Sequence, residues 1–184
     1  MAREDTADGQ ADRGQSRFSR WEIGSPDKWA FPYLNEDHIR FATAVLEDAE
    51  ALLLGRMTYQ GLSEAYMSMP PGPFVDRMNE IPKYVATTTL RDLGWNATAI
   101  KGDVATSVRK LKDQSRGNIV KYGNGILDVP LIQKGLIDEI HLLLTPVAVG
   151  RGIHLFESME GSPQLHLLSV DRFRNGVVLL VYKP

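Results

Sequence analysis

A pair of closely spaced glycines is the first candidate for chemistry in this sequence. Gly123-Asn124-Gly125 follows the strand-like run 119–122, and a helical segment restarts at Asp128. Glycines between a strand and a helix let the backbone approach a ligand closely, and the first N–H groups of a helix attract phosphate. The segment therefore predicts a pyrophosphate-binding turn. Spacing alone favours a plainer alternative, a tight turn in which glycine is the residue that fits, because a short Gly-x-Gly is a weak signal.

Two further segments place phosphate-compatible side chains at the ends of strand-like runs. Gly55-Arg56-Met57-Thr58 follows the apolar run 51–54 and offers a guanidinium and a hydroxyl at the start of the next helix. Thr87-Thr88-Thr89 follows another strand-like run and offers three hydroxyls. Each has an ordinary explanation, a surface arginine beside a helix cap or threonines at a strand end. Because ligands of open α/β sheets bind at the carboxyl ends of strands, three such ends together are more informative than any one of them.

Helical and strand patterns alternate along most of the chain. Helices are expected at 36–48 with Asn35 as N-cap, at 57–65, at 74–80, after the N-cap Asp103, and from Asp128. Strands are expected at 51–54, 84–87, 119–122, 137–144, 165–173 and 177–183, the last two joined by the hairpin signal Asn175-Gly176. This order predicts an α/β fold, a mixed sheet with helices on both faces that ends in an antiparallel C-terminal hairpin.

The first twenty residues differ from the rest of the chain. They mix acidic and basic side chains, contain no Val, Ile or Leu, and have Phe18 as their only aromatic residue. Such a segment buries too little apolar surface to offset its ordering entropy. We therefore expect a mobile polar segment at 1–20 and a single domain over 21–184.

Composition excludes several classes of protein. The chain has 184 residues, no cysteine and a net charge of −2, so disulfide frameworks and thiolate metal sites are absent and nothing favours nucleic acid as a partner. The four histidines show no metal-ligand spacing, and we expect no metal site. No apolar run approaches the roughly 20 residues that span a bilayer, and the N-terminus has no secretory signal pattern. We expect a cytoplasmic protein that binds no membrane.

Several blocks of the sequence together resemble one known family. The blocks are 51–59, 82–90, 123–125, 135–139, 146–152 and Leu155-Phe156. In order and spacing they resemble the dihydrofolate-reductase-like proteins related to the reductase domain of the riboflavin-biosynthesis deaminase/reductase. The resemblance covers roughly residues 29–184 and implies a dihydrofolate-reductase-like fold, NADPH as cofactor and a homodimer.

The resemblance also implies roles for individual residues. Gly55, Arg56 and Thr58 would face the cofactor phosphates, and Thr87 and Thr88 would lie near the adenosine ribose. The remaining positions would wrap the pyrophosphate and the nicotinamide side, and they are Gly123, Asn124, Gly125, Ile126 and Leu127.

Two positions depart from the family pattern. Family members often have Ser-Arg where this chain has Thr87-Thr88, so the guanidinium that would pair with a 2′-phosphate is missing. The preference for NADPH over NADH is therefore expected to be weak or lost. The family also begins with an apolar strand that leads into a Ser/Thr-x-Asp-Gly turn. Here Thr6-Ala7-Asp8-Gly9 resembles the turn, but residues 1–5 do not resemble the strand, and part of 17–23 is a possible replacement.

These observations lead to a functional hypothesis and an alternative. The hypothesis is a reductase that passes hydride from NADPH, or from NADH, to a small pterin-like or pyrimidine-like heterocycle or to a carbonyl compound. Solvent or an acid such as Asp37 is expected to deliver the proton. The alternative is a non-catalytic protein that binds a nucleotide or another small molecule on the same scaffold.

Overall fold

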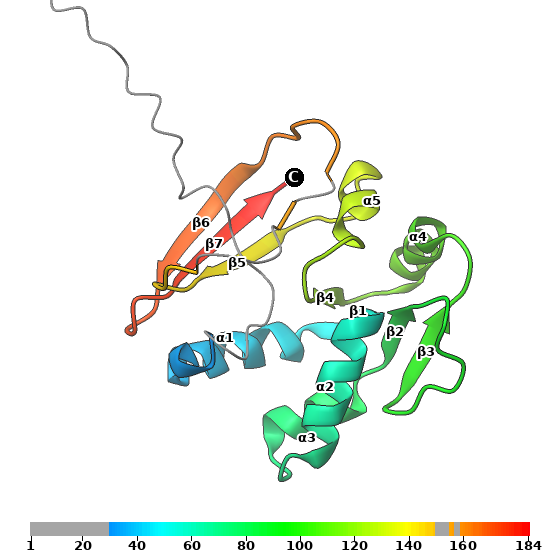
Figure 1. The fold of residues 1–184 in the computed structure, drawn as a ribbon, viewed down its shortest axis with the longest axis horizontal. Coiled ribbons are helices and arrows are strands. Elements are labelled where there is room, and N and C mark those ends of the chain that lie inside the picture. The colour runs from blue at the N-terminus through cyan, green and yellow to red at the C-terminus, as the bar shows by residue number, and fades with distance from the viewer. Residues whose placement is uncertain (1–29, 150–154, 157–158) are drawn as a thin grey trace, which may run out of the picture.

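Two β-sheets organise the part of the chain that the structure describes (Figure 1). The structure is a computed structural model, and it describes residues 30–149, 155–156 and 159–184. A parallel sheet has the order β3-β2-β1-β4, from β1 (Ala49–Gly55), β2 (Lys83–Ala86), β3 (Ala97–Ile100) and β4 (Asn118–Tyr122). An antiparallel sheet has the order β5-β7-β6, from β5 (Ile140–Leu144), β6 (His166–Arg172) and β7 (Val178–Lys183).

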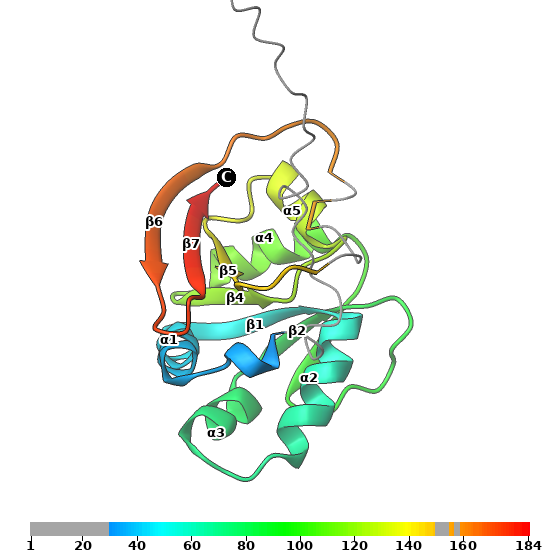
Figure 2. The ribbon, with the colours of Figure 1, turned by 60° about the vertical axis from the view of Figure 1, so that its left-hand side comes forward.

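β1 is buried on both faces, which explains its continuous apolar run. Successive strand residues point to opposite faces. Leu52 and Leu54 join one core cluster with side chains of α2 (Arg56–Ser68) and α3 (Pro73–Glu80). Leu53 joins the other cluster, with α4 (Val104–Gln114) and α5 (Asp128–Gln133). Figure 2 shows these two pairs of helices on opposite sides of β1.

Helix α1 (Glu36–Glu47) connects the two sheets. Asn35 caps it, because the Asn35 side chain accepts a hydrogen bond from the His38 amide over 3.1 Å. Near its end, Leu46 is buried in the core beside the parallel sheet. In its middle, Phe41 packs against the buried face of the antiparallel sheet, where its ring lies 6.3 Å from that of Phe173. A short 3-10 helix, η3 (Phe31–Tyr33), precedes α1.

The hairpin and the helix boundaries agree with the local sequence signals. Gly176 has a φ of +88°, the left-handed conformation that glycine adopts easily, and the hairpin closes through a bond from the Phe173 amide to the Val177 carbonyl. Asp103 caps α4 as predicted, since its carboxylate accepts from the Thr106 amide over 2.7 Å. The predicted α/β class, with helices on both faces of a sheet and a C-terminal hairpin, is confirmed.

The structure also differs from the expected elements in three places. The strands form two sheets, where the sequence predicted one mixed sheet. The four-residue strand β3 was not predicted, because Ala97–Ile100 is too short to show a clear alternation. The strand expected over 137–144 begins only at Ile140. The expected mobile segment 1–20 and the possible replacement strand in 17–23 lie outside the described residues.

Candidate functional site

The order of the parallel strands reverses at β1. From β1 the chain adds β2 and β3 on one side and then returns to add β4 on the other. In open α/β sheets, ligands bind outside the carboxyl ends of the strands at such a reversal. Leu54 of β1 pairs with Tyr122 of β4, and Gly55 pairs with Ala86 of β2. The loops that follow β1, β2 and β4 therefore begin side by side. We call this end of the sheet, where the parallel strands finish, the carboxyl edge.

The first and last of these loops touch each other. Gly123 has a φ of +74°, and a Cβ atom added there would lie 2.4 Å from Oγ1 of Thr58 in the first turn of α2. That separation is far below van der Waals contact, so a side chain at position 123 would force Thr58 to shift. The contact explains why glycine stands at this position, and it brings together two segments that the sequence analysis could only list separately.

Among the residues that the structure describes, no side chain caps the N-terminus of α2. Gly55 occupies the N-cap position with no side-chain hydrogen bond, and the first turn of α2 holds no acidic residue. Within that described part of the chain, no acceptor binds its first N–H groups, which together with the positive end of the helix dipole attract anions. Arg56 is exposed there, with its Nη1 atom 3.0 Å from Oε1 of Gln60. Helix α4, on the other face of the sheet, differs, because Asp103 already binds its first turn and hydrogen bonds from Thr106 hold the pKa of that carboxyl below its ordinary value.

The loop 123–127, here called the glycine loop, has fewer unpaired backbone amides than its sequence suggests. The Gly125 amide donates to Oδ2 of Asp128 over 2.6 Å, so this N–H is already used. Among the described residues, the amides of Asn124 and Ile126 have no partner. The Ile126 side chain is 80% exposed beside them, whereas Leu127 packs on the core below. Because α5 has only six residues, its start offers little attraction for an anion, and any such attraction at this edge would come from α2 and the loop backbone.

The threonines after β2 lie at the same edge, but the Thr87 hydroxyl already accepts hydrogen bonds within its own loop. Its Oγ1 accepts hydrogen bonds from the amides of Thr89 and Leu90, over 3.3 and 3.1 Å. Thr88 is exposed. Ala86 pairs with Ile100 at the end of β3, so Lys101 follows directly beside Thr87. The register therefore places Lys101 at the same end of the sheet as these threonines, and the sequence analysis did not single it out.

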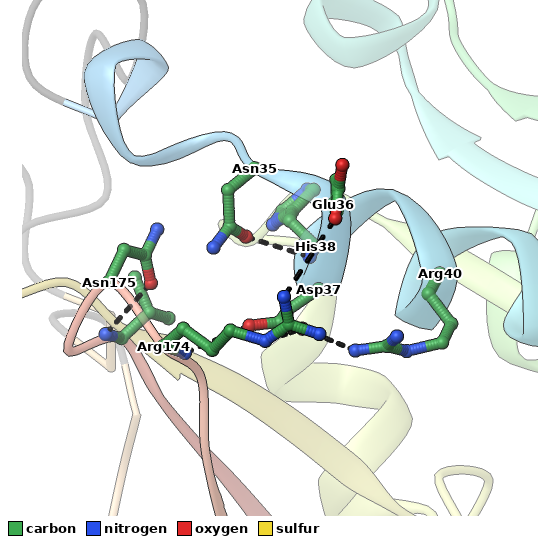
Figure 3. A network of polar contacts seen from close by, with 8 residues as sticks. Asn35, Glu36, Asp37, His38, Arg40, Arg174 and Asn175 are labelled. Carbon is green, nitrogen blue, oxygen red and sulfur yellow. Dashed lines mark hydrogen bonds and ion pairs between the residues drawn. The ribbon is translucent and has the colours of Figure 1, made fainter.

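Asp37 belongs to a separate polar network with Arg40 and Arg174 (Figure 3). It lies in the first turn of α1, at the junction with the β6–β7 hairpin, and the views in Figures 1 and 2 put α1 and the start of α2 at opposite ends of β1. Its Oδ2 atom accepts from the Arg174 amide over 2.8 Å, and its Oδ1 atom lies 3.6 Å from Nε of Arg174 and bonds Arg40. The bond from the Arg174 amide, together with these two guanidinium groups, holds the pKa of Asp37 below its ordinary value. The buried carboxylate thus ties α1 to the hairpin and lies away from the loops that predict cofactor binding.

Sequence reasoning missed a buried ion pair beneath the glycine loop. Lys121 of β4 and Asp128 of α5 pair across 2.6 Å, and both side chains are almost buried. The available signal was a charged residue inside the otherwise strand-like run Asn118–Tyr122. Within the part of the chain that the structure describes, no three or more metal-ligating side chains cluster together, and no helix is both long and apolar enough to cross a bilayer.

Known proteins share both sequence and fold with this chain. Residues 5–179 match the family model of the RibD C-terminal domain. An uncharacterized protein of Bacillus subtilis (strain 168), YyaP, is 27% identical over 167 residues, which cover 88% of this chain and 82% of the relative.

Solved structures of low sequence identity share the fold. A putative riboflavin biosynthesis protein from Shewanella sp. PV-4 is 17% identical with a TM-score of 0.71, and the match covers 90% of this chain and 93% of that one. A pyrimidine reductase-like protein from Corynebacterium diphtheriae is 11% identical with a TM-score of 0.62, covering 88% and 86%. A diaminohydroxyphosphoribosylaminopyrimidine deaminase/5-amino-6-(5-phosphoribosylamino)uracil reductase from Thermotoga maritima is 12% identical with a TM-score of 0.59. That match covers 83% of this chain and only 50% of the larger protein.

Proposed function

Because this chain belongs to the family of the RibD C-terminal domain, we propose that it is an NAD(P)H-dependent reductase. Its substrate is a small heterocycle of the pterin or pyrimidine class, or a carbonyl compound. The fold and the family support an oxidoreductase of the pyrimidine-reductase type. One observation in the structure supports cofactor binding more than any other: the uncapped start of α2 touches the glycine loop at the point where the strand order reverses.

The residues at this edge fit the parts of a dinucleotide. Gly55, Arg56 and Thr58 offer a guanidinium, a hydroxyl and the open N–H groups of α2 to the phosphates. Thr87 and Thr88 offer hydroxyl oxygens for the adenosine ribose.

The glycine loop completes the proposed cofactor site, and its members are Gly123, Asn124, Gly125, Ile126 and Leu127. The free amides of Asn124 and Ile126 suit a pyrophosphate, and the exposed Ile126 side chain offers an apolar surface to a planar ring. The Gly125 amide does not take part directly, because it is bonded to Asp128.

When bound, NADPH or NADH supplies the hydride, and the residues of this chain supply binding and orientation. We do not assign the proton transfer to Asp37, since its carboxylate is held by Arg174 and Arg40. Solvent remains the proposed proton source.

We propose that this chain distinguishes NADPH from NADH only weakly. No guanidinium follows β2 at positions 87 and 88, which leaves Lys101 as the neighbouring cation. The ratio of the two dissociation constants tests this. A ratio near one agrees with the proposal, whereas a large preference for NADPH that disappears in Lys101→Met would contradict it and identify the 2′-phosphate partner.

The homodimer stays a prediction. It is supported by β6, which is an edge strand of the antiparallel sheet as far as the described residues go and exposes more than half of each of three large apolar side chains. They are Leu167, Leu168 and Val170. Edge strands of this kind pair readily with a second chain.

Titration of the protein with NADPH and NADH, followed by nucleotide fluorescence, tests the proposed cofactor site. The informative variant is Gly123→Ala, because its new Cβ would lie 2.4 Å from Thr58 Oγ1. We expect nucleotide affinity to fall at least about tenfold, equal to about 1.4 kcal/mol. The matched control is Gly135→Ala, which has a similarly positive φ of +63° but open space around it. Equal losses in the two variants would mean that backbone strain, and not the contact between the loops, explains the effect.

Turnover is measured separately, as oxidation of the bound nucleotide across a panel of pterins, pyrimidines and carbonyl compounds. Oxidation with any member supports the reductase. Tight nucleotide binding without oxidation by any member favours the alternative, a binding protein on the same scaffold.

A further inference from the structure

A nearly buried ion pair lies directly under the glycine loop. Nζ of Lys121 and Oδ1 of Asp128 are 2.6 Å apart, and the two side chains are 11% and 12% exposed. Removing two charges from water carries a large desolvation penalty, and the mutual attraction offsets it only when further hydrogen bonds satisfy the remaining polar atoms. The partners of those remaining atoms therefore indicate what the pair holds in place.

The remaining contacts all go to the backbone of the loop between the two residues. The Lys121 ammonium also donates to the Gly123 carbonyl. The second carboxylate oxygen of Asp128 accepts from the Gly125 amide over 2.6 Å, and the Asp128 amide donates to the Gly125 carbonyl over 2.9 Å. Each glycine is thus bonded to one member of the pair. A loop with two glycines has many accessible conformations, and these bonds select one of them.

A second lysine–aspartate pair on the same side of the sheet shows a different arrangement. Lys112 of α4 pairs with the exposed Asp138 and donates to the Leu136 carbonyl over 3.2 Å. This pair connects α4 to the segment before β5 and makes no contact with the loops at the carboxyl edge. It is a matched control, because it has the same residue types without the contact to the glycine loop.

We propose that Lys121 and Asp128 are positioning residues that hold the loop 123–127 in its ligand-binding conformation before the ligand arrives. The inference rests on the proposed function, and the ligand class is a phosphate-bearing dinucleotide. The Gly123 carbonyl oxygen, which would repel a phosphate, is engaged by the lysine. The negative charge of Asp128 is neutralised by the same ammonium group. Preorganisation raises affinity, because the ligand then spends little binding energy on ordering the loop.

The test compares Lys121→Met, Asp128→Asn and the double variant with Lys112→Met. Two quantities are measured on the folded full-length protein: the hydrogen-exchange rate of the Gly125 amide without ligand, and the dissociation constants for NADPH and NADH. In Lys121→Met and in Asp128→Asn we expect Gly125 exchange to accelerate at least about tenfold and both dissociation constants to rise about tenfold. Lys112→Met is expected to change neither quantity.

The double variant and a conservative variant separate positioning from general damage. If the two side chains act as a unit, the double variant loses little more affinity than either single variant. Lys121→Arg keeps the charge and the donors, and we expect it to recover part of the affinity. Thermal unfolding followed by circular dichroism confirms that every comparison is made on folded protein.

Each outcome has a distinct meaning. Unchanged Gly125 exchange in Lys121→Met overturns the inference, whether or not a nucleotide binds. Faster exchange with unchanged affinity overturns the link between the held loop and binding. If the unmodified protein binds neither nucleotide, the proposed function fails and the binding half of this inference fails with it, while the exchange rates still decide whether the pair holds the loop.

Discussion

The helix ends near the two ends of the parallel strands differ in how the chain binds them. The amino edge is the end of the sheet where the strands begin, and the carboxyl edge is the end where they finish. At the amino edge, Arg77 donates to the carbonyls of Leu46 and Ala49, and Lys83 donates to the Asn79 carbonyl over 2.9 Å. Leu46 and Asn79 lie in the last turns of α1 and α3, where free carbonyls and the negative ends of helix dipoles gather. At the carboxyl edge, the first turn of α2 contains no acidic side chain, and none of the described residues caps it.

The difference supports the proposal that a ligand binds at the carboxyl edge. At the amino edge, Arg77 and Lys83 already bind carbonyls near the helix ends, so these carbonyls need no ligand. The carboxyl edge keeps a positive helix end next to a glycine loop, and an anion from outside would complete it. The buried Lys83 and the nearly buried Lys121 fit the same division. Lys83 binds a helix end at the amino edge, whereas Lys121 binds the glycine loop at the carboxyl edge.

The largest expected effect comes from truncating the lysine at the amino edge. Lys83 is only 1% exposed, and its ammonium lies 4.2 Å from the centre of the Trp95 ring. Lys83→Ala would remove this buried stem and leave a cavity, so we expect the free energy of unfolding to fall by about 2–4 kcal/mol in a urea titration. Nucleotide affinity should not change. A loss of affinity would contradict the separation of the two edges.

Lys83→Met keeps most of the stem and isolates the contribution of the charge. Burial, with the nearby charge of Arg77, lowers the pKa of Lys83 to about 8 from 10.5. Between these values the unfolded chain binds the proton more tightly, so the free energy of unfolding rises with pH, at most by about 1.4 kcal/mol per pH unit. We expect this rise between pH 8 and 9.5 in the unmodified protein and a weaker one in Lys83→Met.

A further prediction concerns a variant in which the chain itself binds the helix end at the carboxyl edge, as it already does at the amino edge. Gly55→Asp would give α2 its own acidic cap, and the position has open space for a side chain. We expect the free energy of unfolding to rise by about 0.5 kcal/mol. Nucleotide affinity should fall more than about tenfold, because the new carboxylate competes with phosphate for the same N–H groups. Gly55→Ala is the control that adds a side chain without the charge, and equal losses of affinity in both variants would refute the competition.

The smallest effect is expected away from both edges, at Asp37. The Arg174 amide and the neighbouring guanidinium groups lower the pKa of Asp37, so this carboxylate stabilises the folded state above the unfolded pKa of 3.8. That contribution is lost as the pH falls through the lower, folded value. Asp37→Asn should therefore melt below the unmodified protein at pH 7, and the difference should shrink below pH 3.8. Nucleotide oxidation should continue unchanged, and a loss of turnover with normal stability would restore Asp37 as a catalytic candidate.

Local signals predicted local structure well in this protein. The caps at Asn35 and Asp103 and the hairpin at Asn175-Gly176 appear where the sequence indicates them. Each depends on a side chain or a backbone angle within a few residues, which a sequence window contains. Short elements with weak patterns were harder to predict from the sequence. An example is β3, whose four residues contain too few alternations of apolar and polar side chains to indicate a strand.

The candidate site depended on contacts between distant segments. Thr58 meets Gly123 from another strand end, and Asp37 meets Arg174 from the far end of the chain. Lys121 could be read as an exposed strand residue until the fold placed Asp128 beside it. No sequence spacing reports these neighbours, because they follow from the strand order and from how the helices pack on it.

The amino acids by themselves determined the class of fold, the family and the three glycine- or threonine-bearing strand ends, because hydrophobic periodicity and turn chemistry act over a few residues. Only the tertiary structure decided which of those ends meet, which helix end stays uncapped and which charges are paired. The physical reason is that burial and long-range pairing depend on the order of strands in the sheet, and that order brings together residues that the chain keeps far apart.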